Sequence, residues 1–273
     1  MLRRLLFLAL TLSILPAGLL GRWSSSAPEA WEHWEYHDPE NKHPINHSAW
    51  DKFLQKYVRP DGNGYNKFAY SSVTDTDKTR LETYIDNLTQ IEITERARPV
   101  QLAYWINLYN ALTIKVVLDH YPVSSIRNIR LGGILNRGPW DEELVEIEAE
   151  SISLNAIEHE ILRPIWQDPR IHYAINCASV GCPNLHRRAF TATNVDDLLD
   201  QLAEEYLSHP RGFKIEGDIV TVSSIFQWFA YDFGNSEEGV IKHIAQHAPA
   251  NKVEKLLQIG GISDSEYDWS LNQ

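Results

Sequence analysis

The chain has 273 residues, with 37 Asp and Glu against 25 Lys and Arg, so its formal net charge is −12. A surface of this charge repels nucleic acid and anionic lipid, and we expect neither as a partner. With 9 Trp, 12 Tyr and 8 Phe, the chain has enough bulky material for the core of one sizeable domain.

The first 20 residues have the pattern of a secretory signal peptide. Arg3 and Arg4 precede an apolar run from Leu5 to Leu15, and small and helix-breaking residues follow it. This run is shorter than the roughly 20 residues of a spanning helix. We therefore expect a cleaved signal over residues 1–20, a periplasmic or secreted protein, and no stable membrane span. An uncleaved anchor is the alternative.

Residues 21–47 have no sustained apolar period and are rich in Ser, His and acidic side chains, which indicates a flexible leader. A single globular domain is expected over residues 48–273. Apolar spacing predicts a helix from Trp50 to Val58 and another over Leu81 to Leu88. The segment from Pro99 to Tyr121 is apolar almost all round and predicts a buried helix.

The second half of the domain mixes short strands with helices. Loops and one or two short strands are expected between Ile126 and Ile152, followed by a helix that Ser153 or Asn155 caps. The apolar run from Ile171 to Ile175 predicts a strand. The remaining expected elements are a helix over Val195 to Leu207, a hairpin over Phe213 to Val222, and helices beginning at Ser223, Glu237 and Lys252. This pattern predicts an α+β fold, helix-rich, with a small β-sheet.

The only two cysteines, Cys177 and Cys182, follow the predicted strand closely. The end of a strand is a place where scaffolds often present reactive groups, so Cys177 is a candidate thiolate nucleophile. In an exported protein a disulfide between the two cysteines is the structural alternative. A zinc site is a third interpretation, but the cysteine spacing differs from that of structural zinc sites, so we expect no metal and no cofactor.

A histidine between two glutamates, His159, is the candidate general base for Cys177. Two amides on the predicted buried helix, Asn107 and Asn110, lie one turn apart and share a face. Because consecutive helical residues point about 100 degrees apart, these amides are better placed than Glu158 to orient the imidazole ring.

Three further polar residues have open interpretations. His172 and His186 are rival bases. Arg163 either binds a carboxylate of the substrate or pairs with Glu158.

Five motifs in sequence order resemble the domain of unknown function 547 family. They are Gln101 to Ala111, Ile157 to Arg163, Asn176 to Pro183, Trp228 to Phe233 and Tyr267 to Asn272. The resemblance spans Ser48 to Asn272 and implies that the family's characteristic polar positions fall on Asn107, Asn110, Glu158, His159, Arg163, Cys177 and Cys182. The family includes exported bacterial proteins, and its activity is unassigned.

A cysteine with a histidine and an amide or carboxylate is also similar to the site of papain-type thiol hydrolases, which implies a distantly papain-like fold. The sequence therefore predicts a periplasmic thiol hydrolase or acyltransferase that acts on an amide, peptide or thioester bond. Cys177 attacks, His159 moves the proton, and backbone N–H groups after Cys177 stabilise the oxyanion. The alternative is a noncatalytic envelope interaction domain stabilised by a Cys177 to Cys182 disulfide. The substrate and the oligomeric state are left open.

Overall fold

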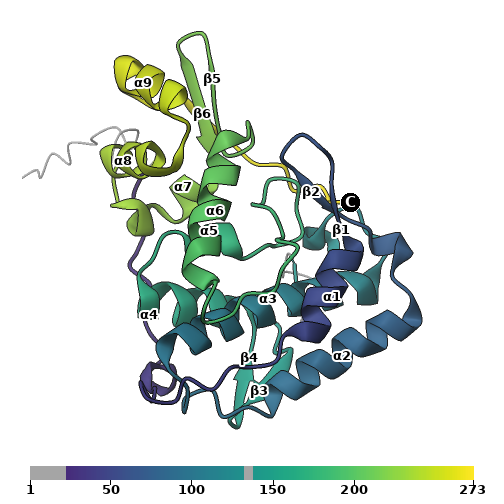
Figure 1. Ribbon diagram of the computed structural model, residues 1–273. Coiled ribbons are helices and arrows are strands. Elements are labelled where there is room, and N and C mark those ends of the chain that lie inside the picture. Colours follow the sequence, from purple (N-terminus) through teal and green to yellow (C-terminus); the bar gives the residue numbers. More distant parts are fainter. Residues whose placement is uncertain (1–22, 132–137) are drawn as a thin grey trace, which may run out of the picture.

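The computed structural model describes residues 23–131 and 138–273 as an α+β domain, rich in helices with small sheets (Figure 1). The predicted fold class is confirmed. The predicted signal peptide lies outside the described residues. Within the described part, no helix is both long enough and apolar enough to span a membrane.

Three helices dominate the first half of the chain: α1 (Ser48–Tyr57), α2 (Asp75–Thr89) and α3 (Arg98–His120). The side chain of Thr74 caps α2 by accepting a hydrogen bond from the backbone N–H of Asp77. A proline in the first turn of α3 suits that position because its missing N–H would have no partner there. As its composition predicts, α3 is buried along most of its length and forms the centre of the core.

Part of the segment predicted as a flexible leader contacts the core of the domain. Trp34 lies in a short 3-10 helix (Glu32–Glu35), is only 2% exposed, and packs edge-on against Trp105 of α3. The backbone N–H of Trp31 donates to the carbonyl of Glu160, and Arg98 donates to the carbonyls of Trp34 and Glu35. A few tryptophans and backbone hydrogen bonds anchor this segment. Neither produces a periodic apolar pattern in the sequence, so the anchoring could not be predicted from it.

The strands form three small sheets among the described residues. They are the antiparallel pairs β1 (Val58–Pro60) with β2 (Asn66–Phe68) and β3 (Val145–Ile147) with β4 (Glu150–Ile152), and a three-stranded sheet of β5 (Phe213–Glu216), β6 (Ile219–Ser223) and β7 (Asp264–Glu266). The hairpin of β5 and β6 turns at Gly217, whose φ of +61° favours glycine. Both the hairpin and the short strands before Ile152 were predicted.

The second half of the chain is largely short helices. They are a π-helix (Ala156–Leu162), α4 (Arg163–Trp166), α5 (Ile171–Ala174), α6 (Val195–Ser208), α7 (Ile225–Trp228), α8 (Glu237–His247) and α9 (Ala250–Ile259). The predicted strand over Ile171 to Ile175 is wrong, because its first four residues form α5 and no sheet delivers Cys177. A short run that is buried on all sides has no period to distinguish a helix from a strand.

Two buried amides on α3 hold the segments that surround the cysteines. Asn107 is fully buried, donates to the carbonyl of Phe190 at 2.8 Å and accepts from the N–H of the same residue at 3.0 Å. Asn110 donates to the carbonyl of Ala174 at 2.9 Å and accepts from the N–H of Asn176 at 2.8 Å. Each amide thus satisfies one backbone carbonyl and one backbone N–H of an irregular segment, as a neighbouring strand would in a sheet.

We expect Asn107→Ala and Asn110→Ala each to lower the free energy of unfolding by about 1 to 3 kcal/mol, because each leaves two buried backbone groups unpaired. Thermal and urea unfolding measure this loss. The matched control is Asn87→Ala, which removes an exposed amide from α2. Equal stability of all three variants would contradict the role of the buried amides.

Candidate functional site

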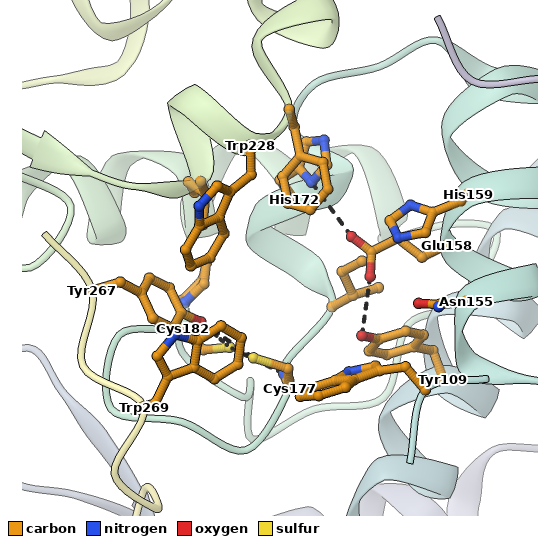
Figure 2. Close-up of a pocket in the computed structure, with 15 residues that line it drawn as sticks. Tyr109, Asn155, Glu158, His159, His172, Cys177, Cys182, Trp228, Tyr267 and Trp269 are labelled. Carbon is orange, nitrogen blue, oxygen red and sulfur yellow. Dashed lines mark hydrogen bonds and ion pairs between the residues drawn. The ribbon is translucent and has the colours of Figure 1, made fainter. Parts of the chain in front are cut away.

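A cavity of about 200 Å³ lies where α3, the π-helix, the cysteine segment and the C-terminal segment meet. Its walls are mostly aromatic and apolar, with a few polar groups. In Figure 2 the two cysteines, Tyr267, Trp228 and Trp269 lie on one side, and Glu158, His159 and His172 on the other. The lining residues are Tyr109, Trp140, Asn155, Glu158, His159, His172, Ile175, Cys177, Cys182, Pro183, Ile225, Trp228, Phe229, Tyr267 and Trp269.

The two sulfur atoms form a compact group with two hydroxyls. Cys177 Sγ lies 2.6 Å from Cys182 Sγ, and both residues are free cysteines. Tyr267 Oη lies 3.2 Å from Cys177 Sγ and 3.1 Å from Cys182 Sγ. Ser179 Oγ lies 3.2 Å from Cys177 Sγ, 3.4 Å from Cys182 Sγ and 2.8 Å from Tyr267 Oη. Every pair among these four groups is therefore in contact, so a negative charge on either sulfur meets three donors.

Cys182 has one donor more than Cys177, because the backbone N–H of Cys177 points at Cys182 Sγ at 3.0 Å. Burial raises the pKa of Cys182, but the hydrogen bonds from Cys177, Ser179 and Tyr267 outweigh this and bring the pKa to about 6. The hydrogen bond to Cys182, burial and the charge of Cys182 raise the pKa of Cys177 well above its ordinary value. The pair therefore holds one proton at neutral pH, with the charge on Cys182.

A buried cation lies close enough to respond to this charge. Arg211 stacks over the rings of Tyr65 and Tyr206, and no carboxylate pairs with it among the described residues. Burial lowers the pKa of Arg211, and the nearby Tyr206, Tyr65 and Cys182 raise it. The thiolate thus supplies part of the negative charge that this guanidinium otherwise lacks.

Side chains and the C-terminal segment hold the turn that carries the cysteines. Asn176 accepts from the N–H of Ala178 at 2.8 Å and donates to the carbonyl of Pro183 at 2.7 Å. Ala178 has a φ of +60°, a conformation that costs a non-glycine residue about 1 to 2 kcal/mol. A Cβ on Gly181 would lie 2.9 Å from the backbone nitrogen of Asp268 and from the ring of Tyr267. Only glycine therefore lets Tyr267 approach the sulfurs.

The opposite wall begins with Glu158. The hydroxyl of Tyr109, on α3, donates to Glu158 Oε2 at 3.1 Å. Burial and the charge of Glu158 raise the pKa of Tyr109 well above its ordinary value, so the phenol stays a donor. Glu158 and His159 both line the cavity although they are consecutive, and they lie in a π-helix, a local distortion that is frequent at functional sites.

Two histidines of this wall are linked through Asp232 and Arg163. His172 Nε2 lies 2.6 Å from Asp232 Oδ2, and Arg163 donates to both oxygens of Asp232, at 2.6 and 3.2 Å. Arg163 also reaches His159 Nδ1 at 3.1 Å. Burial raises the pKa of Asp232, but the bonds from His172 and Arg163 outweigh it and lower the pKa below its ordinary value. Asp232 is therefore a carboxylate and an acceptor in both contacts.

These partners fix the tautomer of each neutral histidine. Arg163 can only donate, so His159 Nδ1 accepts and the ring proton lies on Nε2. Burial, the largest effect, lowers the pKa of His159, and Arg163 lowers it further. When its ring is neutral, His172 has the opposite arrangement, because its Nε2 donates to Asp232 and its Nδ1, 3.9 Å from Glu158 Oε1, is the acceptor. Of the two neutral rings, His172 is therefore the one whose acceptor nitrogen no donor occupies.

The structure brings Cys177, Cys182, Glu158 and His159 to one cavity but changes several predicted roles. No hydrogen bond joins His159 to Cys177 among the described residues, and Arg163 occupies the nitrogen that a base would need. Asn107 and Asn110 do not orient His159, because both amides are committed to backbone groups. The contact with Cys182 instead raises the pKa of Cys177 well above its ordinary value.

Two further expectations change. Arg163 pairs with Asp232 and not with Glu158, and it does not line the cavity. The backbone N–H groups of Ala178 and Val180 already donate to Asn176 Oδ1 and the carbonyl of Ser270, so they are not free for an oxyanion.

His186 lies outside the cavity and contacts Arg188. Among the described residues, no group of three or more His, Cys, Asp and Glu side chains is arranged to hold a metal ion.

Sequence reasoning did not assign roles to Tyr109, Asp232 and Tyr267. Each falls within one of the five motifs, and this position in a motif was the sequence feature that could have identified it as a site residue. Their partners are 49, 60 and 90 residues away along the chain. Spacing within a motif gives no information about contacts of that range.

The comparisons with known proteins find one family that is similar to part of the chain. The family described as "Protein of unknown function, DUF547" matches residues 93–207. This match is shorter than the span from Ser48 to Asn272 over which the motifs resemble the family. No curated protein and no solved structure matches the chain. The chain is therefore similar to the DUF547 family over residues 93–207, which contain Tyr109, Glu158, both histidines and both cysteines of the cavity.

Proposed function

We propose that this protein is a thiol-dependent hydrolase or acyltransferase that acts on an amide, peptide or thioester bond in the periplasm or outside the cell. The observation that carries the proposal is the pairing, across one cavity, of two sulfurs 2.6 Å apart with an imidazole that a carboxylate contacts. One sulfur can take the proton of the other as it attacks, and the positioned imidazole supplies a second proton transfer.

Cys177 is the attacking sulfur in this proposal, because it is half-buried whereas Cys182 is only 3% exposed. As Cys177 Sγ bonds to the carbonyl carbon, its proton passes to the Cys182 thiolate beside it. The hydroxyl of Tyr267, in contact with both sulfurs, donates to the developing oxyanion. The bond to the leaving group then breaks, the leaving group takes the proton from Cys182, and a thioester to Cys177 remains.

His172 acts in the second half of the reaction. Its Nδ1 takes a proton from a water molecule, or from an acceptor alcohol or amine, which attacks the thioester carbonyl. The carboxylic acid or the transferred acyl product leaves, and Cys177 regains its proton. Asp232 stabilises the imidazolium that forms, as the carboxylate of a catalytic triad does. His159, with its proton on Nε2, serves as a hydrogen-bond donor toward the cavity.

The alternative is a noncatalytic interaction domain held by a Cys177 to Cys182 disulfide. The 2.6 Å between the two sulfurs favours it, because oxidation would join them with little movement of the backbone. An oxidised pair has no thiolate, so the two proposals predict opposite thiol chemistry.

The first test is the labelling of the reduced protein with iodoacetamide across pH. We expect Cys177 to react first and its labelling rate to be half-maximal near pH 6, because ionised Cys182 takes the proton of Cys177 as that sulfur attacks the reagent. Cys182→Ser should move this midpoint up toward or above the ordinary thiol value of about 8.5, because Cys177 loses the base beside it. Mass spectrometry of the labelled peptides identifies the site.

The same measurement separates the alternatives. Protein isolated without reductant that accepts no label until reductant is added would support the disulfide domain. A labelling midpoint that is ordinary for a thiol, and unchanged in Cys182→Ser, would contradict the coupled pair. Cys177→Ser serves as the control for labelling of Cys182 alone.

The second test compares the two histidines with a p-nitrophenyl ester as the acyl donor. We expect His172→Gln to lower the rate of deacylation by about 10²- to 10⁴-fold, the usual contribution of a positioned acid or base. His159→Gln should cost at most about tenfold, because glutamine still accepts from Arg163 and donates to the cavity.

The matched control is His120→Gln, which changes an exposed histidine at the end of α3. Circular dichroism establishes that each variant is folded. A larger loss in His159→Gln than in His172→Gln would refute the assignment of the base and restore the one expected from the sequence.

A further inference from the structure

The charges that line the cavity have one sign. Among the described lining residues, the formally charged groups at neutral pH are the carboxylate of Glu158 and the thiolate of the sulfur pair. Arg163 does not line the cavity, and both oxygens of Asp232 engage its guanidinium. A substrate carboxylate would therefore meet no cation among the described lining residues and would face two negative charges.

One oxygen of Glu158 has no donor. Its side chain is 10% exposed, so this exposure is to the cavity, which it lines. Tyr109 donates to Oε2, whereas His172 Nδ1 lies 3.9 Å from Oε1, beyond hydrogen-bonding distance. In the neutral tautomer that Asp232 favours, that nitrogen carries no proton. Glu158 Oε1 is thus a buried acceptor that faces the cavity and awaits a donor from a ligand.

The remaining wall is a cluster of aromatic rings. Trp228 packs on Tyr267 with ring centroids 4.8 Å apart and stacks on Trp269 at 5.6 Å. Trp140 meets Trp269 edge-on at 5.8 Å. Trp228 remains 42% exposed, so the cluster reaches solvent at the mouth of the cavity. Arg127 already lies over the ring of Trp269 at 5.0 Å, which shows that this cluster accepts a cation on its outer face.

We infer that Glu158 and the aromatic cluster of Trp228, Tyr267 and Trp269 form a subsite for a primary ammonium group of the substrate, next to an apolar or aromatic moiety. The ammonium donates to Glu158 Oε1, and the aromatic faces cover the apolar part. This inference rests on the proposed function. If that function holds, the substrate is an acyl compound that carries an amine close to the bond that breaks.

The test is isothermal titration calorimetry of the reduced full chain with three probes of similar size: benzylammonium, benzyl alcohol and phenylacetate. We expect benzylammonium to bind at least about tenfold more tightly than benzyl alcohol, and phenylacetate to bind most weakly. Glu158→Gln should remove the preference for the cation, because glutamine keeps an acceptor for Tyr109 but loses the charge. The matched control is Glu160→Gln, an exposed glutamate of the same π-helix.

Trp228→Ala should weaken the binding of benzylammonium, whereas Tyr231→Ala, which removes an exposed ring outside the cavity, should not. Phenylacetate binding as tightly as benzylammonium, no binding of benzylammonium at millimolar concentration, or an unchanged preference in Glu158→Gln would each overturn the inference. The comparison of probes on the unmodified chain needs no variant to fold. None of the probes donates an acyl group, so failure here is distinct from failure of the thiol chemistry.

Discussion

The position of Cys177 depends on side-chain amides, because no strand holds the segment that carries it. Asn110 joins α3 to the backbone on both sides of Ile175, and Asn176 bonds across the turn to Ala178 and Pro183. These contacts force Ala178 into a left-handed conformation and aim the N–H of Cys177 at Cys182. The extra donor on Cys182 then decides which sulfur carries the charge. The conformation of the turn thus makes the pKa values of two chemically identical thiols different.

Asp232 has a comparable effect on the opposite wall. By accepting from both Arg163 and His172, it engages the guanidinium of Arg163 and leaves Nδ1 as the acceptor nitrogen of the neutral His172 ring. Its neutralisation of Arg163 leaves Glu158 as the charged group that a ligand meets. The ion pair of Arg163 and Asp232 therefore has two effects in the proposed mechanism. It determines which nitrogen of His172 accepts a proton, and it determines which sign of charge on a ligand the cavity favours.

The helices with a clear period could be predicted from sequence, as could the hairpin of β5 and β6. Trp50, Phe53, Leu54 and Tyr57 bury one face of α1, and the apolar surround of α3 gave both its burial and the buried state of Asn107 and Asn110. The segment from Ile171 to Ala174 could not, since a helix of one turn buried on all sides has no polar face to mark its period. The anchoring of Trp34 was invisible for a related reason, as one buried ring creates no pattern.

For the site, sequence could predict which residues share a cavity but not which atoms meet. Glu158, His159, Cys177 and Cys182 were chosen by residue type, and all of them line it. Their roles depend on Arg163 Nη1, Asp232 and the hydroxyl of Tyr267, whose contacts cross 4, 60 and 90 residues. The contact of Arg163 with His159 is local and was available from helical spacing, where i and i+4 side chains meet. The others arise only when the chain folds back on itself.

The residues of the cavity come from two parts of the sequence. Residues 93–207, the segment that matches the family, contain Tyr109, Glu158, the two histidines and the two cysteines. Asp232, Trp228, Tyr267 and Trp269 come after it, and the segment that carries Tyr267 pairs with the cysteine turn through Ser270 and Asp268. Without these later residues His172 would lose the acceptor that fixes its tautomer, and the sulfur pair would lose a donor to its thiolate. The chemistry proposed for the matched segment therefore requires the C-terminal third of the chain, and the two parts form one site.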